Sequence, residues 1–326
     1  MTELQGQSEG DIQVLTMGRV GVDLYPEQLR VPLAEVQTFR KMLGGTATNV
    51  AVAAARYGRS SGVITKVGDD AFGPYVRQAL QEFGVDASRV GTHPTLRTPV
   101  VFCEIFPPDD FPLLFYRAPT APDMTIARDE LDLEEIARVP LFWTTGTGLS
   151  EEPSCTATLA ALDARNRRSI TVHDLDYRPM FWSSETEPGR LGRMAVERAT
   201  VVVGGRTEAI PLVGDRSASD TARALLDLGV ELAVVKLGPD GVLGATQEEE
   251  IVVPPIPVEV VNGLGAGDAF GGALCHGLLA GWPLERTLRF ANAAGALVAS
   301  RLGCADDMPT AAEVEELIGR AEGHDS

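Results

Sequence analysis

The sequence predicts an α/β protein whose mostly parallel central sheet is covered by helices on both faces, with a small β sheet beside it. After residue 123, short apolar runs at 141–145, 170–174, 201–203 and 232–237 alternate with helical stretches. Between residues 98 and 120, two β-rich segments flank a proline-rich turn with no helical stretch between them. The alternation predicts the parallel sheet, and the hairpin predicts the separate small sheet.

The N-terminal half has the same alternation. We predict a first strand over residues 12–22 that ends near Asp23, and a second strand over 62–67. Helical periodicity and flanking glycines predict helices over 50–57 and 71–83. Because ligands bind at the carboxyl ends of the strands in open α/β sheets, Asp23 is a candidate site residue.

The chain of 326 residues is long enough for one large domain with a small addition. We predict a disordered leader over residues 1–11 and one domain over 12–326. Within that domain, we expect residues of about 18–38 and 98–120 to form the small sheet. Exposed sheet edges favour pairing between chains, so this sheet is the expected surface of a homodimer.

Composition excludes several classes of partner. The formal net charge is −18 and the sequence pI is about 4.6, which disfavours nucleic acid and anionic membranes. No apolar run reaches the ~18 residues of a membrane span, and no signal peptide pattern is present, so we expect a cytoplasmic protein. No metal-binding or disulfide spacing connects the four cysteines, which we expect to be buried free thiols: Cys103, Cys155, Cys275 and Cys304.

A glycine-rich segment, Gly265-Ala266-Gly267-Asp268, precedes a helical stretch over 269–280. Its small residues allow the backbone to approach a ligand, and a helix N-terminus favours an anion there. Asp268 would repel a bound phosphate, so we expect it to take a proton from a hydroxyl that attacks the phosphate. The segment predicts phosphoryl transfer to an alcohol, with Asp268 as catalytic base and the three residues before it as the anion hole. The alternatives are a helix-capping Asp and a structural glycine turn.

The motifs together resemble one family. Residues 265–268 resemble the C-terminal signature of the ribokinase-like (PfkB) carbohydrate kinases, and Gly44-Gly45 with Asn49 resembles their N-terminal signature. Residues 68–73 are also similar, and all these motifs occur in the order that the family uses. The resemblance implies a ribokinase-like three-layer sandwich with a small β lid.

Four further segments are similar to those members that phosphorylate the terminal hydroxyl of 5-dehydro-2-deoxy-D-gluconate in inositol catabolism: residues 17–26, 111–117, 173–179 and 291–296. The resemblance therefore implies an ATP-dependent sugar-acid kinase. Alternatives are a 2-keto-3-deoxygluconate kinase or a neutral-sugar kinase of the fructokinase or ribokinase type. A non-catalytic sugar-binding regulator would need no base, and a nicotinamide dehydrogenase would carry an early dinucleotide fingerprint, which is missing.

Several residues suit a polyol. Asp23 can accept hydrogen bonds from vicinal hydroxyls, and the alternative is an Asp in a solvated turn. Gly44 and Gly45 allow close backbone approach, and Asn49 supplies both a donor and an acceptor.

Two arginines are candidates for the acid group of the substrate. Arg117 and Arg178 can each bind a carboxylate with two parallel hydrogen bonds, which a neutral sugar does not need. The alternative is a salt bridge, for which Asp174 and Asp176 are available to Arg178. Weaker candidates for the same contact are Arg19 and Lys41.

The resemblance also implies residues for ATP and Mg²⁺. We expect Lys236, Gly238, Gly241 and Asn292 near the nucleotide, although a helix such as the one around Asn292 is more often plain core packing. The family's magnesium-linked Asn-x-x-Glu motif is reduced here to Glu208, which we carry over as the metal residue.

The cation chemistry departs from the family pattern. Asn262-Gly263 stands where many members carry Asp-Thr, so a carboxylate and a hydroxyl are missing near the phosphates. This change argues against a monovalent-cation site taken over from other members.

Overall fold

The central sheet has ten strands in the order β14-β13-β12-β11-β10-β9-β1-β4-β5, with β6 paired to β4. The computed structural model describes residues 11–324, so all but the last residue of the predicted leader 1–11 lies outside the described residues. Every pair is parallel except β12 with β13 and β13 with β14, which confirms the predicted fold class. The strands are β1 (Val14–Met17), β4 (Ser61–Gly68), β5 (Val85–Asp86), β6 (Val90–His93), β9 (Leu141–Thr145), β10 (Ile170–Asp174), β11 (Val201–Gly205), β12 (Leu232–Lys236), β13 (Val242–Ala245) and β14 (Glu250–Val253).

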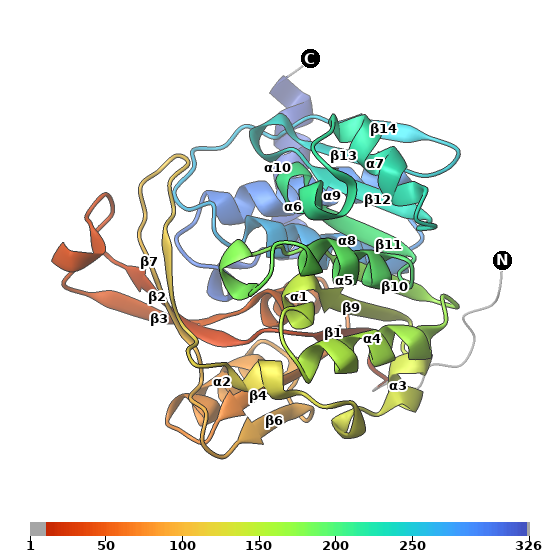
Figure 1. Cartoon of the computed structure of the whole chain (residues 1–326). Coiled ribbons are helices and arrows are strands. Elements are labelled where there is room, and N and C mark those ends of the chain that lie inside the picture. The colour runs from red at the N-terminus through yellow and green to blue at the C-terminus, as the bar shows by residue number, and fades with distance from the viewer. Residues whose placement is uncertain (1–10, 325–326) are drawn as a thin grey trace.

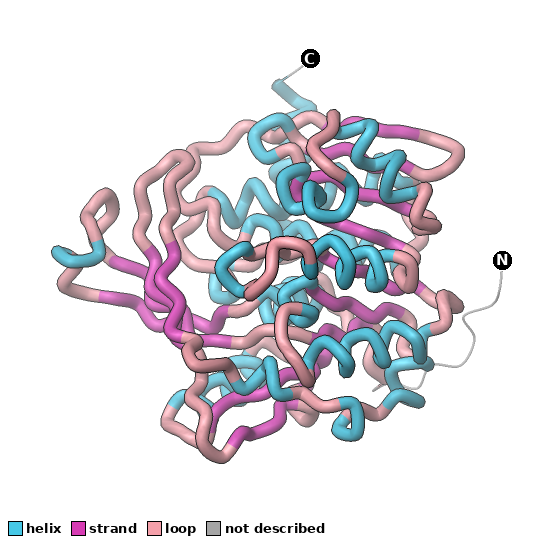
Figure 2. Tube along the Cα trace, in the orientation of Figure 1, coloured by secondary structure: helices cyan, strands magenta, loops and turns pink. Residues whose placement is uncertain are grey.

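Helices cover both faces of the sheet (Figure 1, Figure 2). Consecutive residues of β11 show why both faces need cover: Val201 and Val203 pack into one apolar cluster, and Val202 packs into another. One face carries α1 (Thr46–Arg56), α2 (Phe72–Glu82), α8 (Ala266–Leu279), α9 (Leu284–Ala299) and α10 (Ala311–His324). The other carries α3 (Leu133–Arg138), α4 (Ser154–Arg165), α5 (Glu187–Val196), α6 (Arg206–Val213) and α7 (Ala218–Leu226).

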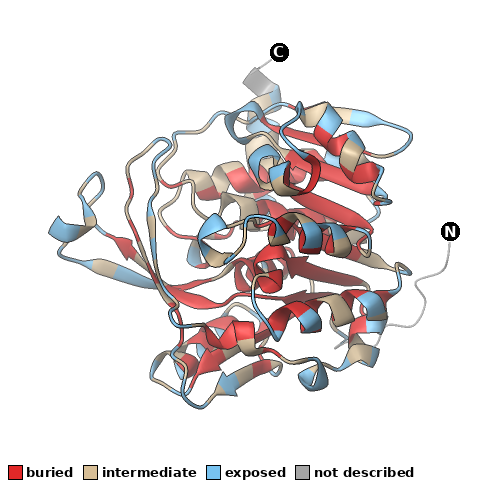
Figure 3. Cartoon of the chain, viewed as in Figure 1, coloured by how far each residue is buried: buried red, intermediate tan, exposed pale blue. Residues whose placement is uncertain are grey.

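A second sheet of four strands, in the order β3-β2-β7-β8, projects from the main body (Figure 1). It contains β2 (Gly21–Pro26), β3 (Phe39–Gly44), β7 (Val100–Cys103) and β8 (Leu113–Tyr116). The expected hairpin is β7 with β8, and β3 follows the segment 18–38 that we expected in this sheet. Residues of β8 alternate between partial burial and exposure, so one face of the sheet meets solvent (Figure 3).

The prediction of a single strand over residues 12–22 is wrong. β1 ends at Met17, and a new strand, β2, begins at Gly21 in the other sheet. The break falls at Gly18-Arg19-Val20, where a glycine and a charged residue interrupt the apolar pattern. Asp23 therefore lies inside a strand of the small sheet and not at the end of the first strand of the main sheet.

Residues 238–241 form the turn between antiparallel β12 and β13. At the start of α10, the backbone N–H of Thr310 donates to Oε2 of Glu313 over 2.7 Å, as in a capping box. The four cysteines are buried and unpaired, which confirms the prediction of free thiols. No helix among residues 11–324 is long and apolar enough to cross a membrane.

Helices α1 and α8 cross at very short range. A Cβ at Gly272 of α8 would overlap Cβ of Ala53 and lie 2.9 Å from the backbone nitrogen of Ala54 in α1. Only a glycine permits this approach. The crossing matters because α1 and α8 each carry a candidate site residue in the first turn, Asn49 and Asp268.

We predict that Gly272→Ala lowers the free energy of unfolding by about 1–3 kcal/mol, because the added methyl group overpacks the crossing. Urea unfolding followed by circular dichroism measures this change. The matched control is Gly319→Ala in α10, where an added Cβ meets no atom within 4 Å. The control should be neutral or gain up to about 1 kcal/mol from helix propensity. Equal stability of both variants would contradict the prediction.

Candidate active site

A cavity of about 250 Å³ lies between the carboxyl ends of the parallel strands and the small sheet. This is the edge at which open α/β sheets bind ligands. Ten of the predicted site residues line it: Asp23, Gly45, Asn49, Arg117, Arg178, Glu208, Lys236, Gly265, Gly267 and Asp268. The remaining five do not line it: Gly44, Ala266, Gly238, Gly241 and Asn292.

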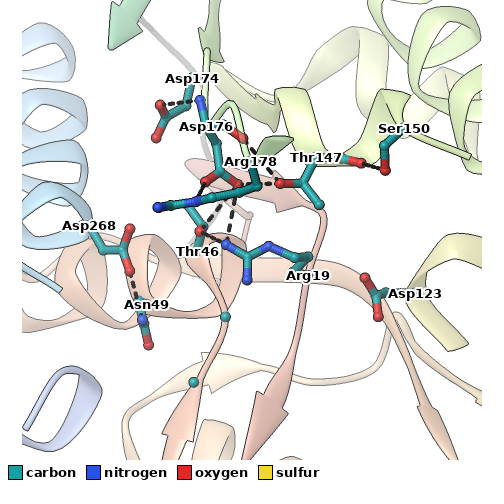
Figure 4. Close-up of polar contacts among 12 residues, drawn as sticks. Arg19, Thr46, Asn49, Asp123, Thr147, Ser150, Asp174, Asp176, Arg178 and Asp268 are labelled. Carbon is teal, nitrogen blue, oxygen red and sulfur yellow. Dashed lines mark hydrogen bonds and ion pairs between the residues drawn. The ribbon is translucent and has the colours of Figure 1, made fainter. Parts of the chain in front are cut away.

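The first turns of α1 and α8 meet at one side of the cavity. Nδ2 of Asn49 donates a hydrogen bond of 2.7 Å to Oδ2 of Asp268 (Figure 4). Both helices begin earlier than predicted, at Thr46 and Ala266, because a glycine with positive φ ends the preceding segment at Gly45 and Gly265. The base candidate therefore lies within the helix's first turn, where backbone N–H groups are unsatisfied.

Gly265 has φ of 81° and lies against Cys304. A Cβ at Gly265 would overlap Sγ of Cys304 and lie 2.9 Å from its Cβ, so both the conformation and the space require glycine. Sγ of Cys304 lies 2.7 Å from Oη of Tyr25 in β2. Cys304 thus connects the segment that we expect to hold an anion to the small sheet.

Burial changes the protonation of two carboxyl groups. Desolvation raises the pKa of Asp268 to about 6, against the hydrogen bond from Asn49, which favours the charged form. Desolvation likewise raises the pKa of Asp23 to about 7, although Arg19 and Tyr25 oppose the rise. A carboxyl group with a pKa near 6 can accept a proton at neutral pH and release it again.

Gly44 does not line the cavity, but packing around it explains why this position is a glycine. It pairs with Gly21 across β2 and β3, and a Cβ there would overlap the carboxylate of Asp23. Gly44 therefore leaves room for Asp23 to face the site. Oη of Tyr25 donates to Oδ2 of Asp23 over 3.3 Å and holds that orientation.

Three arginines also line the cavity: Arg19, Arg117 and Arg178. Asp176 binds two of them, since its Oδ2 lies 3.3 Å from Nη2 of Arg19 and its Oδ1 lies 3.0 Å from Nε of Arg178 (Figure 4). Nη2 of Arg117 lies 2.8 Å from Oδ2 of the buried Asp123. The salt bridge that was the alternative role for Arg178 is thus present. The two Nη atoms of Arg178 nevertheless make no hydrogen bond with the described residues.

Asp176 is fully ionised in this arrangement. Burial alone would raise its pKa, but Arg19 and Arg178 outweigh burial and hold the pKa at about 2. Oγ1 of Thr147 adds a hydrogen bond of 2.8 Å to Oδ2. The guanidinium groups of Arg19, Arg117 and Arg178 therefore lie in salt bridges with two carboxylates, those of Asp123 and Asp176.

Another side of the cavity lies at the ends of β10 and β12. Nζ of Lys236 is 3.8 Å from Oε2 of Glu208, which also accepts a hydrogen bond from the backbone N–H of Gly205 as a cap of α6. Asp174 ends β10 and lines the same region. Burial raises the pKa of Asp174 to about 7, with Lys236 opposing the rise and Glu208 supporting it.

Sequence reasoning missed the roles of Asp174 and Asp176, which it named only as partners of Arg178. The signal that could have found Asp174 is its place at the carboxyl end of a predicted parallel strand. The remaining predicted nucleotide residues lie outside the cavity. Gly238 and Gly241 bound the turn after β12, and Nδ2 of Asn292 donates to the backbone oxygen of Pro254 over 2.8 Å.

A cavity with a helix N-terminus, a carboxylate and a cationic wall suits transfer of a phosphoryl group to a polar acceptor. The chain matches the model of the pfkB family of carbohydrate kinases over residues 11–311, and it belongs to that family. The protein is therefore a sugar kinase, a phosphotransferase with an alcohol group as acceptor.

Relatives and solved structures agree with this assignment. The chain is 33% identical over 325 residues to a 5-dehydro-2-deoxygluconokinase of Geobacillus kaustophilus, covering 98% of this chain and 97% of the relative. A PfkB protein from Polaromonas sp. JS666 superposes with a TM-score of 0.82 at 26% identity, over 93% of this chain and 99% of that one. A fructokinase double mutant from Vibrio cholerae O395, solved with fructose, ADP and potassium, has a TM-score of 0.81 at 27% identity, over 95% and 99%.

We predict that Asn49→Ala raises the pKa of Asp268 further, by about one unit, because a charge-assisted hydrogen bond of ~1.5 kcal/mol to the carboxylate is lost. Carboxyl ¹³C NMR of the ligand-free protein between pH 4 and 9 measures the titration. The signal of Asp176 is the internal control, since its low pKa keeps it unchanged over this range. The same pKa for Asp268 in Asn49→Ala as in the wild-type protein would contradict the prediction.

Proposed function

We propose that this kinase uses ATP to phosphorylate the terminal hydroxyl of 5-dehydro-2-deoxy-D-gluconate, giving the 6-phosphate in inositol catabolism. The observation that carries the proposal is that Arg117 and Arg178, the two arginines expected to bind the acid group of a substrate, both line the cavity. A guanidinium group can bind a carboxylate with charge-assisted hydrogen bonds, which a neutral sugar does not need. The name of the Geobacillus kaustophilus relative supports the particular acid.

In the proposed reaction the sugar acid lies across the cavity. Its carboxylate binds the arginines, and its hydroxyls face Asp23 and Asn49, whose Oδ1 is buried without a partner. The terminal hydroxyl then reaches Asp268. Asp268 takes the hydroxyl proton as that oxygen bonds to the γ-phosphorus, and the bond from the γ-phosphorus to the bridging oxygen breaks to release ADP.

The N-terminus of α8 supports the charge on the transferred group. Backbone N–H groups of Gly265, Ala266 and Gly267 are among those without an intrahelical partner, so they can donate to phosphate oxygens. Lys236 adds a cation whose pKa is kept high by Glu208 and Asp174 in spite of burial. These groups would stabilise the anionic transition state.

The described residues contain no cluster of three or more acidic, histidine or cysteine side chains that could hold a metal ion without help. Mg²⁺ does not require such a cluster, because it keeps several waters and binds substrate phosphates through one or two carboxylates. Asp174 and Glu208 fit that requirement, and we propose them as its protein contacts. When bound, Mg²⁺ would neutralise phosphate charge.

We assign no monovalent-cation site at Asn262. Its Nδ2 donates 2.7 Å to the backbone oxygen of Leu302, and its Oδ1 accepts 3.0 Å from the N–H of Leu264. Both groups of the amide are used to brace the loop before α8, which explains why a neutral side chain stands here.

The small sheet is the proposed lid and the proposed dimer surface. Leu114 and Tyr116 of the edge strand β8 are 46% and 61% exposed, as expected for side chains that a second copy would cover. A mass of one chain by light scattering at micromolar concentration would refute the homodimer.

A coupled ADP-release assay over acidic and neutral sugars tests the proposed substrate class. We predict a kcat/KM for 5-dehydro-2-deoxy-D-gluconate about 10–100-fold above that for a neutral sugar, because a bidentate charge-assisted contact is worth ~1.5–3 kcal/mol. 2-Keto-3-deoxygluconate is the close comparison. Equal or greater activity on fructose or ribose would refute the acid-sugar proposal, and ADP release from none of the sugars would favour a non-catalytic binder.

We predict that Asp268→Asn lowers kcat at least 10²–10⁴-fold while ATP still binds, because the amide keeps the shape of the side chain but cannot take the proton. The same assay, with ATP binding followed by calorimetry, measures both effects. Asp227→Asn, at an exposed position at the end of α7, is the matched control and should keep wild-type turnover. Wild-type turnover of Asp268→Asn would exclude Asp268 as the base.

A further inference from the structure

Arg19 occupies an unusual place for an arginine. It lies in the connection between β1 and β2, where the chain passes from one sheet to the other, and it is only 7% exposed. Despite this burial it lines the active-site cavity. A buried guanidinium needs partners for its donors, so the position of each nitrogen indicates what the group can bind.

The nitrogens of Arg19 are used unequally. Nη2 donates to Oγ1 of Thr46 over 2.6 Å and to Oδ2 of Asp176 over 3.3 Å. Nε is buried without a partner. Nη1 makes no hydrogen bond with the described residues and, unlike Nε, is not sealed from the cavity. One donor of a fixed guanidinium is therefore available to a ligand.

An aromatic wall holds the group in place. The guanidinium carbon of Arg19 lies 6.0 Å from the ring centre of Phe115 and 5.8 Å from that of Phe181. The guanidinium carbon of Arg117 lies 5.2 Å from the centre of the same Phe181 ring. The rings of Phe115 and Phe181 pack edge to face, with their centres 5.0 Å apart. Arg117 and Arg19 thus share one wall, while Arg19 and Arg178 share Asp176.

Lys41, the other weak candidate, has a different environment. Its Nζ lies 3.6 Å from the ring centre of Tyr75, its side chain is exposed, and it does not line the cavity. Lys41 is therefore not placed to contact the acid group of a ligand in the cavity.

We propose that Arg19 is a specificity-determining residue of this kinase, which donates Nη1 to the substrate's carboxylate and is positioned for that contact by Asp176. The inference rests on the proposed function, since it assumes an acidic substrate. It adds a third arginine to the predicted pair. It also gives Asp176 a role as a positioning residue, because a single carboxylate orients Arg19 and Arg178 together.

The test compares the sugar acid with its uncharged carboxamide analogue in the Arg19→Met variant of the full chain. We expect kcat/KM for the acid to fall about 10–100-fold, as for loss of a hydrogen bond to a charged group, while kcat/KM for the carboxamide changes less than about threefold. The KM for ATP should stay the same. Lys41→Met is the matched control and should leave both substrates unaffected.

Equal losses of kcat/KM on acid and carboxamide would overturn the proposal, because they would indicate a structural role. An absence of loss on either substrate would also overturn it. If Arg19→Met does not fold, the same comparison is made with Arg19→Lys, because lysine keeps the positive charge but lacks the second terminal nitrogen of a guanidinium group. An acid preference reduced at least threefold would support the proposal, and a smaller change or none would overturn it. The wild-type preference for acid over carboxamide is the separate test of the proposed function, so the two failures are distinguishable.

Discussion

The contact between the first turns of α1 and α8 is the constraint on which the site depends. It brings Asn49 within 2.7 Å of Asp268, and it exists only because Gly272 lets the two helices touch. The same contact fixes the N-terminus of α8 at the edge of the sheet. One helix crossing therefore places the amide of Asn49 beside the base candidate and the anion site, which lie more than 200 positions later in the sequence.

Two carboxyl groups of the cavity differ in protonation because their surroundings differ. Desolvation raises the pKa of Asp268 to about 6, which makes the carboxyl group basic enough to take a proton. Asp176 instead has a pKa of about 2, because Arg19 and Arg178 outweigh the effect of its burial. The proposed substrate carries both a carboxylate, which arginines can bind, and a hydroxyl, which Asp268 can deprotonate.

Local signals predicted the central sheet well, because buried strands between helices differ sharply in composition from their surroundings. They failed at Gly18-Arg19-Val20, where the chain leaves β1 and enters β2, so that Asp23 lies in the small sheet. The glycine motif predicted the neighbourhood of Asp268. The convergence of Arg19 on Asp176 could not be predicted, since it joins residues 157 positions apart through the small sheet's entry point.

The proposed site fixes the direction in which a sugar acid lies in the cavity. A crystal structure with 5-dehydro-2-deoxy-D-gluconate and a non-hydrolysable ATP analogue measures this direction. We predict the carboxylate at Arg19, Arg117 and Arg178, and the terminal hydroxyl about 2.6–3.2 Å from Asp268. A substrate bound in the reverse direction, with its carboxylate at the N-terminus of α8 and its terminal hydroxyl among the arginines, would contradict it.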